Sequence, residues 1–177
     1  MVVFVGGLVF AHVQFKEAKR QRDLKWMAEL EARIWTYKKI AEQGDAEAQN
    51  RLGNSYLLGQ EVAKNPAEAV KWFRLAAEQG NVDAGNNLAW ILAVFNDAAL
   101  RNGKEAVKWA TKICVATGYG DWQKLDTLAA AFAEAGEFQK AVEYQQMALD
   151  RCKGPVDLRT AAQERLKLYQ QGKPFRE

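Results

Sequence analysis

The sequence predicts an all-α protein, an α-solenoid of antiparallel helix hairpins with a tetratricopeptide-like superhelix. Strong helix formers are plentiful, and only three of the 177 residues are proline. The motif Ala-Glu-Gln-Gly occurs at residues 41–44 and again at 77–80, and Glu-Ala-Val-Lys-Trp or its variant Lys-Ala-Val-Glu-Tyr starts at residues 68, 105 and 140. Recurrence at about 36 residues is the signature of stacked helical repeats.

Charge and the scarcity of cysteine and histidine narrow the function. The formal net charge is +3, too small to indicate a nucleic-acid-binding protein. Residues 16–39 hold eight basic and four acidic side chains, so this segment carries +4 and the rest of the chain −1. Cys114 and Cys152 are too few for a disulfide framework, and His12 is the single histidine. We expect no metal, no cofactor and no nucleic-acid partner.

Residues 1–22 form a separate segment, in which an apolar stretch at 2–15 precedes basic residues. The stretch is shorter than the about 20 residues that span a bilayer, and it lacks both a preceding basic residue and a cleavage site. Three interpretations remain: a marginal membrane anchor or truncated signal anchor, an apolar element packed on the repeats, or a longer leader cut off by a misplaced start codon. The basic flank favours a cytoplasmic body. We expect membrane contact through residues 2–39 and a membrane-associated or bacterial cell-envelope location, with a cytoplasmic location as the alternative.

A helical repeat domain is expected over residues 23–177. Its first element is a helix over 23–44, which is expected to cap the array as the second helix of a degenerate preceding unit. Apolar residues recur along it at helical spacing. They are Leu24, Met27, Leu30, Ile34, Tyr37 and Ala41.

Residues 45–80 are predicted to form the first repeat. The apolar stripe of its first helix is Ala48, Leu52 and Tyr56, and Gly59 ends that helix. Asn65 is expected to cap the second helix, with Pro66 in its first turn and Glu68 completing a capping box. The buried face of the second helix is predicted to be Ala69, Phe73, Ala76 and Ala77.

Residues 81–120 and 121–153 are predicted to form the second and third repeats, and residues 155–172 a C-terminal capping helix. Asn102 is expected to cap the second helix of the second repeat. The predicted core residues of the two repeats are Leu88, Leu92, Ala106, Ala110, Ile113, Cys114, Leu125, Leu128, Phe132, Ala141, Gln145, Ala148 and Leu149. The final helix carries Leu158, Ala162, Leu166 and Tyr169, and is stopped by Gly172 and Pro174.

Several residue types recur with the repeats. Small residues stand where paired helices must approach closely. They are Gly53, Ala89 and Ala129 on the first helices and Ala69, Ala106 and Ala141 on the second. Trp35, Trp72, Trp109 and Tyr144 are expected to pack between helices. Cys114 is expected to be buried and Cys152 more exposed, without a disulfide between them.

The pattern Ala-x-x-Gly-x-x-x-Ala-x-x-x-Leu-Gly-x-x-Tyr-x-x-Gly, followed by Val, Ala, Trp and Ala-Ala-x-x-Gly, spans Ala41–Gly80 and resembles the Sel-one-like (Sel1-like) repeat. The third unit resembles a tetratricopeptide repeat in Leu128, Ala129, Phe132, Gly136, Ala141, Tyr144 and Ala148. Together these resemblances cover residues 41–152. They imply a scaffold for protein–protein interaction.

The tetratricopeptide resemblance also implies a site, because positions two, five, nine and thirteen of the first helices commonly line a concave groove in that family. Here these positions are Glu47, Asn50, Asn54, Leu58, Asp83, Asn86, Trp90, Val94, Gln123, Asp126, Ala130 and Glu134. We expect a peptide-binding strip formed by Asn50, Asn54, Asn86 and Trp90. The alternative is that the asparagines are ordinary solvated residues and that Trp90 packs between helices.

The implied groove is acidic, through Glu47, Asp83, Asp126 and Glu134. We therefore expect it to bind a neutral or basic segment of a partner protein, less tightly at high salt. A scaffold tethered at a membrane is the function that the sequence favours, and an interaction or regulatory part of a larger protein is the alternative. A hydrolase has less support, because a nucleophile needs a base and the repeats contain no histidine and a single serine, Ser55. We expect no catalysis.

Overall fold

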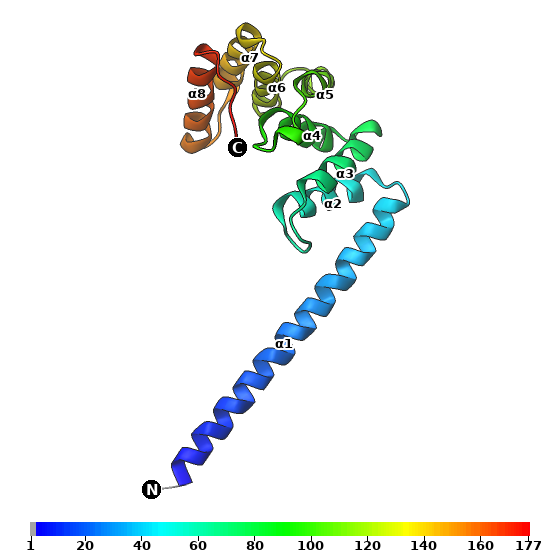
Figure 1. Ribbon diagram of the computed structural model, residues 1–177, viewed down its shortest axis with the longest axis vertical. Helices are drawn as coiled ribbons and strands as arrows, with labels where there is room; N and C mark the ends of the chain where they lie inside the picture. Colours follow the sequence, from blue (N-terminus) through cyan, green and yellow to red (C-terminus); the bar gives the residue numbers. More distant parts are fainter. Residues whose placement is uncertain (1–2) are drawn as a thin grey trace.

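The structure, a computed structural model, is helical wherever it describes the chain (Figure 1). It describes the main chain of residues 3–177 and the side chains of residue 12 and of residues 14–29 and 32–177. The described part contains no strand, and its helices are α1 (Val3–Glu42), α2 (Ala46–Leu58), α3 (Pro66–Glu78), α4 (Val82–Val94), the 3-10 helix η1 (Ala98–Leu100), α5 (Gly103–Ala116), α6 (Trp122–Glu134), α7 (Phe138–Arg151) and α8 (Val156–Gln170). The all-α class and the α-solenoid are confirmed.

Helices α2 to α7 form three successive hairpins in two layers. Each of α2, α4 and α6 packs against the helix that follows it, and α4 also packs along α6, so these first helices make one layer of a curved array. Helices α3, α5 and α7 make the other layer, and α8 packs on α7 (Figure 1). The chain then turns back, and its final residues enter the hollow between α8 and α4 (Figure 1).

Helix termini follow the predicted capping residues, with one correction. The side chains of Asn65, Asn81 and Asn102 each accept a hydrogen bond from a main-chain N–H three residues later. The predicted capping box at Glu68 does not form, because the N–H of Asn65 donates to the carbonyl oxygen of Tyr56 (2.8 Å) and the Glu68 carboxylate pairs with a lysine of its own helix. A single side-chain cap therefore begins α3.

The core is the set of faces that the spacing predicts. Every residue of the predicted α3 face is buried, and so are the predicted core residues of the second and third repeats. Small residues are required at the helix crossings: a Cβ on Gly53 would lie 2.7 Å from the ring of Phe73, and one on Gly103 would lie 2.7 Å from the main-chain nitrogen of Ala135. The six small residues at equivalent repeat positions are all buried.

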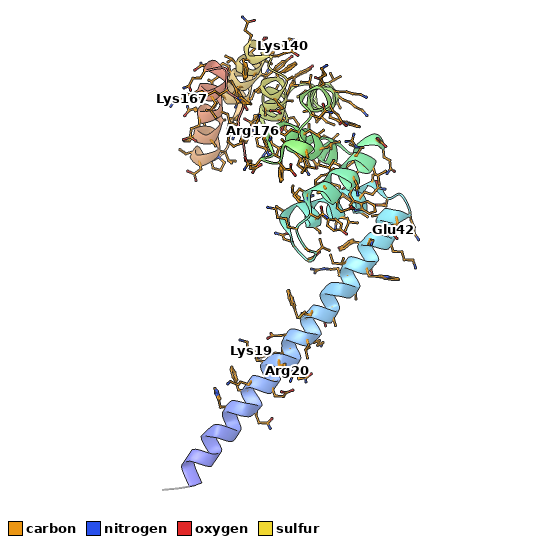
Figure 2. The ribbon with its side chains drawn as sticks, viewed as in Figure 1. Lys19, Arg20, Glu42, Lys140, Lys167 and Arg176 are labelled. Carbon is orange, nitrogen blue, oxygen red and sulfur yellow. The ribbon has the colours of Figure 1, made fainter. Side chains whose placement is uncertain are left out.

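The N-terminal helix differs from the expectation of a packed cap. Helix α1 is continuous over Val3–Glu42 and projects away from the repeats, and the basic side chains of Lys19 and Arg20 stand clear of the solenoid (Figure 2). Among the described side chains of α1, Ala41 near the end of the helix is buried against α2, whereas Leu24 and Met27 are each 51% exposed.

The idea that residues 2–15 pack on the repeats is wrong for the part that the structure describes. Residues 3–15 belong to the projecting helix, and Phe15 is 63% exposed. Met1 and Val2 lie outside the described residues, and so do the side chains of Leu30 and of most of the apolar stretch. Among the helices described, none combines the length and the apolar character that crossing a membrane requires.

Two smaller expectations are also corrected. Cys152 is buried rather than exposed, and both it and Cys114 are free thiols. Trp35 does not pack between helices but is 63% exposed, with the ammonium group of Lys39 over its ring at 5.0 Å. At the equivalent place in the second repeat, Trp109 is buried as expected.

Candidate functional site

The twelve positions expected to line the groove lie on α2, α4 and α6, but they differ in exposure. Four are exposed, namely Glu47, Leu58, Asp83 and Gln123; four are intermediate, namely Asn54, Asn86, Trp90 and Glu134; and four are buried, namely Asn50, Val94, Asp126 and Ala130. Of the fifth positions of the first helices, Asn50 and Asp126 are buried and Asn86 is partly buried. The face open to solvent is therefore narrower than the sequence suggests.

Asn50, Asn86 and Asp126 occupy equivalent positions in the three repeats, with different surroundings. The side-chain oxygens of Asn50 and Asn86 are buried, and no described residue donates a hydrogen bond to either. In the third repeat, the Asp126 carboxylate accepts two hydrogen bonds from the guanidinium of Arg165 on α8 (3.0 and 2.8 Å) and one from the Gln145 amide (2.6 Å). The C-terminal capping helix thus supplies hydrogen-bond donors to the Asp126 carboxylate of the third repeat. The equivalent oxygens of Asn50 and Asn86 in the first two repeats have no donor among the described residues.

The last residues of the sequence lie extended against the first-helix layer. Gly172 ends α8 with a φ of +68°, and Pro174 favours an extended conformation at Lys173. The N–H of Glu177 donates to the carbonyl oxygen of Val94 (2.9 Å), and the N–H of Asn96 donates to the main-chain oxygen of Glu177 (3.1 Å). This pair of hydrogen bonds resembles one rung of a parallel β-ladder at the end of α4.

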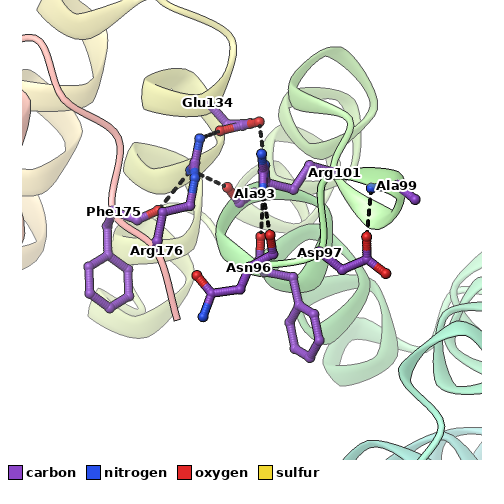
Figure 3. Close-up of polar contacts among 9 residues, drawn as sticks. Ala93, Asn96, Asp97, Ala99, Arg101, Glu134, Phe175 and Arg176 are labelled. Atoms are coloured by element: carbon purple, nitrogen blue, oxygen red, sulfur yellow. Dashed lines mark hydrogen bonds and ion pairs between the residues drawn. The ribbon is translucent and has the colours of Figure 1, made fainter.

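Side chains of the same segment fix its position. The Arg176 guanidinium forms an ion pair with Glu134 (2.6 Å) and donates to the carbonyl oxygen of Ala93 (3.4 Å) (Figure 3). The Phe175 ring lies against Trp90 with a centroid separation of 6.2 Å. The guanidinium of Arg165 lies within 5.6 Å of both ring centroids.

Trp90 lies where the part of the groove that residues 175–177 fill meets the part that they leave open. Its indole N–H donates to the Glu177 carboxylate (2.8 Å). Both residues line a cavity of about 470 Å³ between α2 and α4, which Leu58, Lys64 and Phe95 also line. A second cleft, of about 360 Å³, lies between α1 and α2 beside Tyr37. The open part of the concave face is therefore the part formed by the N-terminal helices.

Some of the carboxylates that were expected to make the groove acidic are paired with basic side chains, and others remain exposed. Glu134 is neutralised by Arg101 (3.1 Å) and Arg176, and Asp126 by Arg165. Asp83 keeps a 74% exposed side chain and pairs with Lys124 at 3.5 Å. Burial opposes the charged form of Lys124, but its hydrogen bond to Asp121, supported by Asp83, holds its pKa above the ordinary value.

The site offers little for catalysis. Ser55 lies in α2 beside the cleft at α1, with no histidine in the repeats to serve as its base. Within the described part of the chain, no group of three or more His, Cys, Asp or Glu side chains could hold a metal ion.

Sequence reasoning missed the residues that fill the groove: Arg165, Phe175, Arg176 and Glu177. Residues 173–177 belong to no repeat, so no periodic pattern marks them. The chemistry of two side chains is the one feature of the sequence that relates this segment to the groove: Phe175 is an aromatic partner for Trp90, and Arg176 is a cationic partner for Glu134.

Comparisons with known proteins agree with this geometry. A family model of the Sel1 repeat matches residues 46–81 and 86–114. A solved protective antigen of uropathogenic Escherichia coli strains, which displays an SLR fold, is 32% identical, with a TM-score of 0.56 over 80% of this chain and 30% of that one. A Sel1 repeat protein from Oxalobacter formigenes is 27% identical over 76% of this chain and 96% of its own, with a TM-score of 0.49.

Among curated proteins, an F-box protein of Arabidopsis thaliana is 42% identical over 64 residues. This match covers 36% of the present chain and 18% of the F-box protein, so the chain spans a small part of that relative. Sel1 repeats typically form protein-interaction scaffolds and are generally not catalytic. The repeated helix hairpins and the matches at residues 46–81 and 86–114 show that the chain contains Sel1-like repeats.

Proposed function

We propose that this chain is a scaffold that holds an extended segment of a partner protein along the concave face of α2 and α4. One observation carries the proposal: the same face already holds residues 175–177 in extended form, through main-chain hydrogen bonds, an aromatic contact and an ion pair. We expect the part of this face that residues 175–177 leave uncovered to offer a second extended segment the same kinds of contact.

The open part begins at Trp90 and runs toward α2. The exposed side chain of Leu58 and the indole of Trp90 supply apolar area in the cavity between α2 and α4. Asn54 lines the cleft between α1 and α2 and accepts a hydrogen bond from Asn87 of α4 (3.4 Å). The unpaired oxygens of Asn50 and Asn86 are buried. An unpaired buried acceptor costs about 1–3 kcal/mol, so a donor from a partner has a driving force to reach it after small side-chain movements.

Charge selects the partner. Glu47 and Asp83 remain exposed at the start of α2 and α4. The pair of Glu47 with Arg51 (3.1 Å) is open to solvent and therefore weak. Asp83 is 74% exposed, and its partner Lys124 lies closer to Asp121 (2.8 Å) than to Asp83 (3.5 Å). A neutral or basic segment is favoured, and its affinity falls with salt.

Panning a displayed random-peptide library on the full chain tests the proposal. The enriched peptides are expected to be neutral or basic and to bind at least about tenfold less tightly to a variant that combines Asn54→Ala with Leu58→Ser, a loss of about 1.4 kcal/mol. Both changes lie on α2, and neither side chain forms a hydrogen bond or an ion pair with residues 175–177, although Leu58 lines the cavity that Glu177 also lines. Leu75→Ala, on α3, is the matched control because Leu75 is exposed in the other layer. Peptides that bind the α2 variant as tightly as the wild type would contradict the proposal.

The projecting helix α1 supports the further proposal that the scaffold is tethered at a membrane. Eight basic residues between Lys16 and Lys39 follow the apolar stretch, and the described side chains there are largely exposed. Basic residues near an anionic surface contribute about 1 kcal/mol each. Cosedimentation with phosphatidylserine vesicles, but not with phosphatidylcholine vesicles, is expected, and charge reversal at Lys19 and Arg20 should weaken it. Equal recovery with both lipids, or none with either, would contradict tethering by this segment.

A further inference from the structure

Residues 173–177 contact the repeats mainly through individual side chains, as a bound peptide does, and not through the packed face of a helix. The Lys173 N–H donates to the carbonyl oxygen of Leu168 at the end of α8 (3.0 Å); beyond it, main-chain bonding is the single rung at the end of α4, and the other contacts come from three consecutive side chains. Phe175 contacts Trp90, Arg176 contacts Glu134, and Glu177 accepts from the Trp90 indole. Such a set can be reproduced by any chain that presents the same three side chains in the same order.

The pocket that receives these side chains belongs to the solenoid. Glu134 is held by Arg101, which also donates to the carbonyl oxygens of Phe95 and Asn96 (2.7 and 2.9 Å) (Figure 3). Arg165 is fixed by Asp126 and presents its guanidinium face to Trp90 and to the aromatic ring. The Glu134 carboxylate and the Arg165 guanidinium are thus held by contacts that do not involve residues 173–177.

We propose that residues 173–177 are an intramolecular ligand of the groove between α4, α6 and α8, and that the groove takes in trans a partner segment in which an aromatic residue is followed by arginine. This inference rests on the proposed function and deepens it by naming the partner sequence for this part of the face. Two residues, 171 and 172, join the segment to α8. Such a short connection gives the segment a millimolar effective concentration, so a competitor must bind tightly or the segment must be released first.

The test uses the full chain with Phe175→Ala and Arg176→Ala combined, and Lys173→Ala as the matched control. The Lys173 side chain is exposed, and its recorded hydrogen bond is to Gln171 in the same segment. The probe is a fluorescein-labelled peptide with the sequence of residues 172–177, followed by fluorescence polarisation. Hydrogen exchange at the Asn96 amide reports whether the segment has left the groove, because that N–H donates to Glu177.

The double variant is expected to lose protection at Asn96 at least tenfold and to bind the peptide at least tenfold more tightly than the wild type or the control. The same peptide carrying Glu in place of Arg176 should not bind. Unchanged Asn96 exchange in the double variant would overturn the proposal. Freed exchange without peptide binding would also overturn it, and would make the segment a structural cap, all the more so if thermal stability falls. Neither result affects the α2 variant test, so the two proposals fail separately.

Discussion

Arg165 on α8 donates two hydrogen bonds to the carboxylate of Asp126 on α6, at 3.0 and 2.8 Å, across 39 residues of sequence. Both side chains are largely buried, with 12% and 8% of their surfaces exposed. The pair ties the C-terminal capping helix to the third repeat and places the Arg165 guanidinium beside Trp90. The same pair therefore contributes to the stability of the array and sets the shape of the groove beside Trp90.

Asp126→Ala is expected to destabilise the protein by about 3–5 kcal/mol, because it leaves the Arg165 guanidinium buried without its charge partner. Asp126→Asn keeps the shape of the side chain and one acceptor, so it should cost less. Urea unfolding followed by circular dichroism measures both. A cost of Asp126→Ala below about 1 kcal/mol would mean that water reaches Arg165 and that the pair is not a structural tie.

Gly103→Ala tests the close approach of α5 to the end of α6. The added Cβ would lie 2.7–2.8 Å from main-chain atoms of Glu134 and Ala135, which cannot move as a side chain tip does. A loss of about 1–3 kcal/mol is expected. Gly154→Ala is the control, because its nearest neighbour would lie at an ordinary 3.6 Å and its φ lies outside the left-handed region. If thermal unfolding shows equal effects for the two variants, the helices are not in contact at Gly103.

Sequence periodicity predicts the repeats well because each hairpin is specified by its own residues. Phe73 and the alanines of α3 fall on one face whatever surrounds them, and Asn65 and Asn102 cap the helices that follow them. The capping residues of α3 and α5, the buried faces of the repeats and the small contact residues were therefore accessible without coordinates.

The site was less accessible, for two physical reasons. How closely neighbouring first helices approach is a property of the stacked array, so Asn50 and Asp126, expected to face a ligand, are buried between helices. Residues 175–177 contact α4 and α6 across more than 40 residues, and no local pattern encodes such a contact. The same limit explains α1, whose apolar residues at helical spacing suggested a partner that the described residues do not supply.

The exposed length of α1 gives a paired prediction. Ala41→Glu places a carboxylate at a position that is 1% exposed against α2, and it should destabilise the repeats by roughly 3 kcal/mol. Leu24→Glu changes a residue that is 51% exposed, and it should stay within about 0.5 kcal/mol of the wild type. Chemical unfolding of both variants decides the matter. A large effect of Leu24→Glu would show that this part of α1 packs on something in solution.

Cys114 gives a pH dependence. Burial, with a smaller contribution from the charge of Asp121, raises the pKa of its thiol to about 11 from the ordinary 9.0. Above pH 9 the unfolded chain therefore loses this proton before the folded chain does, and the free energy of unfolding should fall between pH 9 and 11. The contribution of this one group is roughly 2 kcal/mol over that range.

Cys114→Ala separates this contribution from the tyrosines and lysines that titrate in the same range. The variant is expected to be less stable at neutral pH, because the side chain it shortens is fully buried. Its free energy of unfolding should nevertheless decline less steeply than that of the wild type from pH 9 to 11. Chemical unfolding at fixed pH values measures the two slopes. Parallel slopes would mean that the thiol ionises as readily in the folded as in the unfolded chain, and so that water enters between α5 and the third repeat.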